Sequence, residues 1–171
     1  MSNAIPFIDL KTQYRALEDS IKERMHKVLE HGQYIMGPEV RELEQKLEAY
    51  NGAKHCITVA SGTEALLISL MAMGIQPGDE VITPSLTWVS TVNLIRLCGA
   101  TPIFADIDRN TLMISRETVE PLITERTRLI IPVHFAGAAV DLEQLRQMAA
   151  SRNIPLIEDA AHAAGTEYRG E

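Results

Sequence analysis

Ile154-Pro155-Leu156-Ile157-Glu158-Asp159-Ala160-Ala161-His162 is the stretch that decides the fold. A short apolar run after a proline predicts a buried strand of a parallel sheet, and this run delivers the carboxylate of Asp159 to the C-terminal end of that strand. Open α/β sheets bind their ligands at the edge where the strands end. The stretch therefore predicts an α/β protein with a candidate site at Asp159.

The composition is that of an ordinary globular protein. Of the 171 residues, 46% are hydrophobic and 23% are charged, and the formal net charge is −7. That charge argues against a nucleic-acid partner, and no apolar run approaches the ~20 residues that a membrane-spanning helix needs. The N-terminal residues do not resemble an export signal, and the apolar surroundings of Cys56 and Cys98 suggest neither a disulfide nor a metal site. We expect a cytoplasmic protein that binds no membrane and no metal.

The pattern along the chain changes near residue 50. Residues 10–50 carry apolar side chains at three- and four-residue spacing, interrupted by glycines and a proline at 31–38, which predicts two helices. Beyond them, short Val- and Ile-rich runs alternate with helical stretches, which predicts a largely parallel sheet with helices on both faces. The strand candidates are 56–60, 80–83, 102–105, 129–133 and 155–157, and the helix candidates are 63–73, 87–97, 117–123 and 142–152. We expect an N-terminal helical segment, 1–50, and an α/β domain, 51–171.

The tetrapeptide Ser-Gly-Thr-Glu at 61–64 follows the first strand candidate and opens a helix. Ser61 and Glu64 fit a capping box, and Asp141 fits the same pattern at a later helix. Gly62 would let a ligand approach the backbone, and the free N–H groups of a helix N-terminus suit a phosphate. Simple helix capping explains the same residues, and on the tetrapeptide alone that interpretation is favoured.

Four further residues could carry chemistry, and each has a structural alternative. Trp88, the only tryptophan, could stack on a flat ring, although large aromatic side chains are more often packed in a core. Asp159 could pair with a cationic ligand or simply cap the next helix. His162 lies three residues later, one helical turn away, so it could face the same pocket. His134 ends another strand candidate, where it could line a substrate pocket or be an ordinary polar strand end.

Four segments, in order along the chain, resemble the DegT/DnrJ/EryC1/StrS family of pyridoxal phosphate (PLP) sugar aminotransferases. They are Gly-x-Tyr-x-x-Gly-Pro at 32–38, Ser-Gly-Thr-x-Ala at 61–65, Thr-Pro-Ser-Leu-Thr-Trp at 83–88 and Ile-Glu-Asp-Ala-Ala-His at 157–162. The resemblance covers essentially the whole chain. It implies the large domain of a type I aminotransferase, a mostly parallel α/β sheet, in truncated form.

The resemblance also implies a role for each candidate residue. Gly62 and Thr63 would hold the phosphate of PLP, and Trp88 would lie over its ring. Asp159 would pair with the pyridinium nitrogen, where a carboxylate keeps the ring protonated, and His162 would contact the ring hydroxyl. Tyr34 would lie near the substrate. The implied partners are glutamate or 2-oxoglutarate, a nucleotide-linked keto sugar and a second copy of the chain in a homodimer.

The catalytic lysine of the family would follow the Asp159 motif, but the last lysine here is Lys54. We therefore expect that this lysine lies beyond Glu171, that the chain alone is inactive, and that strand candidate 56–60 lacks its partner. The segments 83–91, 108–113 and 132–137 look like those of enzymes that aminate UDP-4-keto-arabinose, whereas 7–10 and 31–38 look more like those of enzymes that aminate 3-keto sugars. Two other functions stay open. One is a PLP-dependent sugar dehydratase with histidine in place of the lysine, and the other is a non-catalytic protein.

Overall fold

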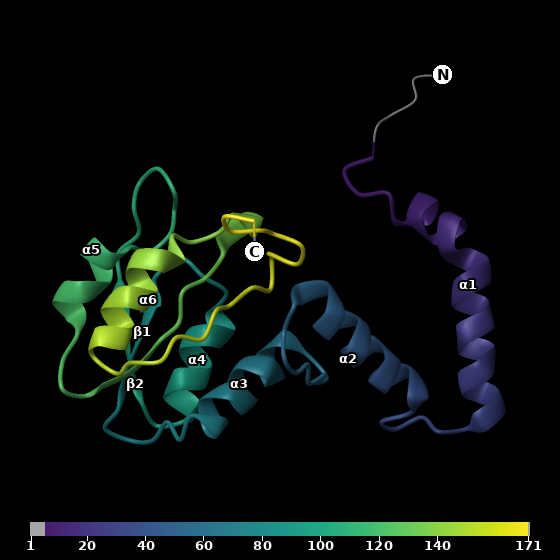
Figure 1. The fold of residues 1–171 in the computed structure, drawn as a ribbon, viewed down its shortest axis with the longest axis horizontal. Helices are drawn as coiled ribbons and strands as arrows, with labels where there is room; N and C mark the ends of the chain where they lie inside the picture. Colours follow the sequence, from purple (N-terminus) through teal and green to yellow (C-terminus); the bar gives the residue numbers. More distant parts are fainter. Residues whose placement is uncertain (1–5, 171) are drawn as a thin grey trace. The chain divides into compact units, whose positions relative to one another are not determined.

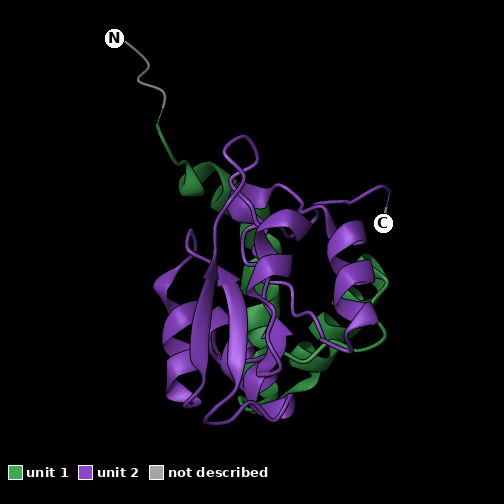
Figure 2. Ribbon diagram, turned by 90° about the vertical axis from the view of Figure 1, so that its left-hand side faces the viewer, with its two compact units in different colours: residues 1–58 green, residues 59–171 purple. Residues whose placement is uncertain are grey.

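The computed structural model describes residues 6–170 (Figure 1). It divides into two compact units, residues 1–58 and residues 59–171, which are drawn in green and purple in Figure 2. Each unit is described by itself below.

The first unit is built from two helices, as the sequence predicts. Helix α1, Leu10–His31, begins where the Asp9 carboxylate accepts the Thr12 N–H at 3.1 Å, and it ends at Gly32 in the left-handed conformation. Helix α2, Pro38–Asn51, begins with a proline in its first turn, where the missing N–H costs nothing. None of the residues of α1 is buried, so its apolar stripe of Leu17, Ile21 and Met25 lies on the surface of this unit.

The strand predicted at 56–60 does not form, and this prediction is wrong. The segment has no assigned secondary structure, and two of its N–H groups are bound by glutamate side chains of α2 in place of a neighbouring strand. Glu48 accepts the N–H of Cys56 at 2.9 Å, and Glu44 accepts the N–H and the hydroxyl of Thr58 at 2.9 and 2.7 Å. Cys56 and Thr58 are half-buried, so their backbone donors need acceptors, and here carboxylates supply them.

The second unit contains a parallel sheet. Strands β1, Glu80–Pro84, β2, Thr101–Ala105, and β3, Thr127–Ile130, lie in the order β2-β1-β3, and both pairs are parallel. The segment quoted first runs beside β3 and pairs with it in parallel, but as two bridges, Ile130 with Leu156 and Val133 with Asp159, and not as a continuous strand. Pro132 and Pro155 have no N–H to donate, which explains why β3 ends before the predicted Val133 and why the last pairing is interrupted.

Helices occupy the intervals that the sequence predicts, with small shifts at their ends. They are α3, Gly62–Ala72; α4, Val89–Leu97; α5, Arg116–Val119; and α6, Leu142–Ser151; short 3₁₀ turns lie at η1, Glu120–Leu122, and η2, Phe135–Gly137. The capping box predicted at Asp141 is absent. The carboxylate of Asp141 does not cap α6 and instead accepts a hydrogen bond from the hydroxyl of Tyr168 at 2.6 Å.

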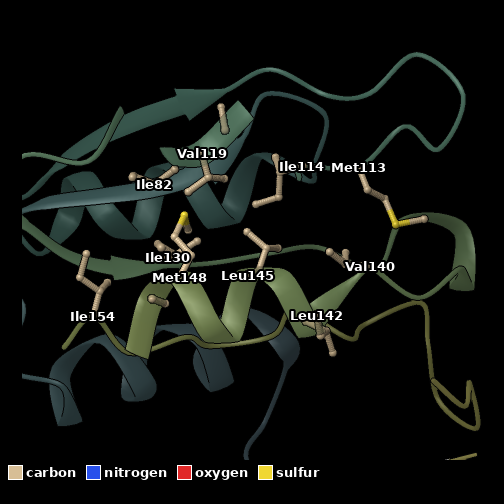
Figure 3. Packing of buried hydrophobic residues seen from close by; sticks show 12 residues of the cluster. Ile82, Met113, Ile114, Val119, Ile130, Val140, Leu142, Leu145, Met148 and Ile154 are labelled. Carbon is tan, nitrogen blue, oxygen red and sulfur yellow. The ribbon is translucent and has the colours of Figure 1, made fainter. Parts of the chain in front are cut away.

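Two apolar clusters hold helices against opposite faces of the sheet. Val81 and Ile82 are consecutive in β1 and therefore point to opposite sides. Ile82 packs with α5 and α6 in the cluster of Figure 3, which also contains Leu145, Met148 and Ile130. Val81 belongs to the second cluster, with residues of α3 and α4. The α/β architecture with helices on both faces is therefore confirmed.

Candidate cofactor-binding site

A pocket of about 580 Å³ opens in the second unit. Its walls come from the first turn of α3, the start of α4, the turn at Phe135 and the segment that follows the last sheet pairing. Five of the residues predicted from the sequence line it, namely Gly62, Thr63, Trp88, Asp159 and His162. Segments far apart in the sequence thus converge at the C-terminal edge of the parallel sheet, where α/β folds bind ligands.

The N-terminus of α3 forms one wall. Ser61 accepts the N–H of Glu64 at 3.2 Å, as a capping residue does, whereas the Glu64 carboxylate accepts the N–H of Ala60 at 3.0 Å. A Cβ on Gly62 would meet no atom within 4 Å, so the backbone here faces open space. The helix N-terminus carries a partial positive charge and free N–H groups, and both suit a phosphate. Thr63 adds a hydroxyl, which lies 3.2 Å from that of Ser90.

Trp88 lies at the N-cap position of α4 and lines the pocket. It is 75% exposed, so it is not part of the core. An exposed indole beside a pocket can stack on a planar ring, and offset stacking is one of the arrangements that aromatic rings prefer.

Asp159 is only 9% exposed and yet reaches the pocket. Its Oδ2 accepts the hydroxyl of Thr91 at 3.2 Å, and its Oδ1 accepts the N–H of Ala161 at 3.2 Å. The neighbouring Glu158 is paired with His134 and Arg146, but within residues 6–170 no ion pair includes Asp159. A carboxylate shielded from water is costly without a cation. The pocket therefore presents a site for a positively charged group.

His162 is held by the turn at η2. Its ring makes an edge-on contact with Phe135, with centroids 6.4 Å apart and an interplanar angle of 63°. Gly137 adopts a φ of +85°, and a Cβ there would lie 3.0 Å from the carbonyl oxygen of His162. The hydroxyl of Thr166 donates to the carbonyl oxygen of Gly137 at 2.6 Å. Close backbone approach and ring contact together fix His162 beside the pocket.

His134 and Tyr34, the two predicted substrate residues, lie in other surroundings. His134 is 5% exposed and is not among the residues that line the pocket. Its Nδ1 accepts the N–H of Val140 at 3.1 Å, which leaves the proton on Nε2, 3.1 Å from Glu158. Tyr34 is 67% exposed and belongs to the first unit, so its substrate role stays a prediction.

Several lining residues were not singled out from the sequence. Thr87, Ser90, Thr91 and Phe135 all reach the pocket. The four-residue spacing of Thr87 and Thr91 at the start of a helix puts both hydroxyls on one side, a signal that was present in the sequence.

Among residues 6–170 no group of three or more His, Cys, Asp or Glu side chains is placed to bind a metal ion, and no helix is long and apolar enough to span a membrane.

Comparison with known proteins agrees with this geometry. The chain belongs to the DegT/DnrJ/EryC1/StrS aminotransferase family, whose match extends over residues 15–171, and the family predicted from the sequence is thereby confirmed. Aminotransferases of this family depend on PLP, which is the predicted cofactor class.

Individual relatives are similar over nearly the whole chain. A UDP-2-acetamido-2-deoxy-3-oxo-D-glucuronate aminotransferase from Pseudomonas aeruginosa is 47% identical over 98% of the chain and 46% of its own length. DesV of S. venezuelae, solved in complex with a ketimine intermediate, superposes with a TM-score of 0.95 at 37% identity, over 99% of this chain and 46% of that one. NtdA of Bacillus subtilis, solved with bound PMP, superposes with a TM-score of 0.87 at 33% identity, over 94% of this chain and 37% of that one. The chain thus spans about half the length of these relatives, and these superpositions confirm the predicted fold class.

Proposed function

We propose that this chain forms the cofactor-binding part of a PLP-dependent aminotransferase that acts on a nucleotide-linked keto sugar. The observation that carries the proposal is the buried carboxylate of Asp159, which faces the pocket without a cationic partner among the described residues. A protonated pyridine nitrogen is a cation of suitable size, so the residues present fit the cofactor of the family. The similarity to NtdA, solved with PMP, supports the same assignment.

Each wall of the pocket has a task in this proposal. The N-terminus of α3, with Gly62 and Thr63, binds the phosphate through backbone N–H groups and a hydroxyl. Trp88 covers one face of the ring and keeps water from it, and His162 contacts the ring oxygen. Asp159 holds the proton on the ring nitrogen. With that nitrogen protonated, PLP supplies an electron sink for the transfer of an amino group.

The proposed partners are glutamate as amino donor and a UDP-linked keto sugar as acceptor. The name of the Pseudomonas relative supports a 3-oxo-glucuronate derivative as the first acceptor to test, and a UDP-linked 4-keto-pentose is the second.

We also propose a homodimer, which the apolar stripe on α1 supports, because exposed apolar patches of this kind are often covered by a partner. Sedimentation over a concentration series tests the dimer, and a monomer at every concentration would contradict it.

The activity is tested with the protein as its gene encodes it. Glutamate and each UDP-linked keto sugar are supplied, and 2-oxoglutarate and the amino sugar are measured. We expect both products in equal amounts and their loss in Asp159→Asn, whereas Asp106→Asn, an exposed aspartate outside the pocket, serves as the matched control. A deoxygenated keto sugar formed in place of the amino sugar would favour a dehydratase, and the absence of both 2-oxoglutarate and an amino sugar with either substrate would contradict the proposed substrates.

A further inference from the structure

Thr91 connects two elements that meet at the pocket. It is the third residue of α4 and is 1% exposed, and its hydroxyl donates to Oδ2 of Asp159 at 3.2 Å. A threonine inside a helix commonly turns its hydroxyl to the backbone of its own preceding turn. Here the hydroxyl instead binds a carboxylate 68 residues later in the sequence.

The direction of this hydrogen bond follows from counting protons. A threonine hydroxyl has one proton, and a carboxylate can only accept, so the proton of Thr91 lies toward Asp159. The hydroxyl of Thr87 is 3.4 Å from that of Thr91, and it must therefore be the donor of that contact. The result is a chain of donors, from Thr87 just before α4, to Thr91 in its first turn, to Asp159.

The two oxygens of Asp159 are held in different ways. Oδ1 is bound by the N–H of Ala161, two residues along the same segment, so that contact moves with the backbone of Asp159 itself. Oδ2 is bound from α4, a separate element. The terminal torsion of an aspartate is broad, so one contact leaves the plane of the carboxylate free to turn. A second donor on the other oxygen fixes that plane, and two of about four acceptor positions remain for a ligand.

We propose that Thr91 is a positioning residue that sets the plane of the Asp159 carboxylate toward the ring nitrogen of the bound cofactor. This inference rests on the proposed function, because it assigns the task of Asp159 to that ring. In this proposal Thr91 acts on the ring only through the carboxylate that it orients.

The test measures binding of pyridoxamine phosphate, which has the ring and phosphate of PLP but no aldehyde to react with surface lysines. Trp88 is the only tryptophan of the chain and lines the pocket, so its fluorescence is the readout. Thr91→Val removes the hydroxyl and keeps the shape, and binding should weaken about tenfold, the equivalent of ~1.4 kcal/mol. Thr91→Ser keeps the hydroxyl and should restore affinity to within about twofold. Thr101→Val, an exposed threonine of β2 outside the pocket, is the matched control.

A double-mutant cycle separates positioning from a structural role. In the Asp159→Ala background no side-chain oxygen is left for Thr91 to orient, so Thr91→Val should change the dissociation constant less than about twofold. A residue that merely supports the fold would weaken binding equally in both backgrounds. Urea unfolding of the ligand-free variants is measured alongside, and if Thr91→Val does not fold, Thr91→Ala replaces it in the cycle.

Two results would overturn the inference while leaving the proposed function intact. One is a Thr91→Val variant that binds pyridoxamine phosphate as tightly as the parent protein while Asp159→Asn binds it weakly. The other is an equal loss of affinity from Thr91→Val in the parent protein and in the variant at Asp159. If the parent protein binds no pyridoxamine phosphate, the proposed function fails and the inference fails with it.

Discussion

Substitution of Asp159 by asparagine separates a cofactor ligand from a residue that only stabilises its own turn, because the two roles predict opposite effects on stability and binding; among residues 160–170 no helix follows that Asp159 could cap. The side chain keeps its size but loses its charge. In the ligand-free protein, the charge-assisted bonds to Thr91 and to the N–H of Ala161 weaken by about 1 kcal/mol each. Relief of a shielded, unpaired carboxylate acts in the opposite direction. We therefore expect the free energy of unfolding to change by no more than about 1 kcal/mol.

Binding should respond far more strongly. A hydrogen bond between a carboxylate and a cationic ring nitrogen contributes about 1.5–3 kcal/mol, which corresponds to about 10- to 150-fold in the dissociation constant. Titration with pyridoxamine phosphate, followed by the fluorescence of Trp88, measures this loss, and urea unfolding of the ligand-free protein measures stability. Asp106→Asn should change neither. Unchanged affinity together with a clear loss of stability would assign Asp159 to its contact with Ala161 and would refute the ligand role.

Three further substitutions test other parts of the molecule. Gly62→Ala should leave the free energy of unfolding unchanged or raise it by up to ~1 kcal/mol, because a Cβ there meets no atom. The same substitution should weaken the binding of pyridoxamine phosphate. An affinity equal to that of the parent protein would remove Gly62 from the phosphate site. His134→Ala should lower the free energy of unfolding by about 2–4 kcal/mol, because it leaves the buried N–H of Val140 without an acceptor, whereas an alanine at an exposed histidine of α1 should have little effect. A hydrogen bond from the hydroxyl of Thr124 is the main reason why the pKa of Glu80 lies below its usual 4.5. The ionised Glu80 therefore stabilises the fold above pH 4.5. This contribution is lost as the pH falls through the lowered pKa. Urea midpoints between about pH 6 and pH 3 should therefore fall less steeply in Glu80→Gln, and parallel curves would contradict this reasoning.

Local sequence was enough to predict most helices and the direction of the sheet. Apolar spacing located the helices of both units, and the Val- and Ile-rich runs located β1, β2 and β3. These patterns are readable because the 3.6-residue and two-residue periods reflect which side of each element is buried. The motifs at 61–64 and 157–162 likewise identified residues that line one pocket.

The errors have a common physical origin in pairing between distant segments. The run at 56–60 has strand composition, but a strand exists only beside another, and carboxylates of α2 accept the N–H groups of Cys56 and Thr58 instead. Asp141 has the composition of a cap, but its carboxylate is taken by the hydroxyl of Tyr168, 27 residues away. Neither competitor can be recognised from local sequence.

The sequence by itself determined the elements, the parallel sheet, and which residues could bind a phosphate or a cationic ring. Only the tertiary structure decided how those residues are held. It alone shows that Thr91 binds Asp159, that Phe135 contacts His162, and that His134 binds Glu158 and Val140 and does not line the pocket. The reason is that composition and period report the burial of each element, whereas the partner of a polar side chain depends on which distant segment the packed sheet brings within hydrogen-bonding distance.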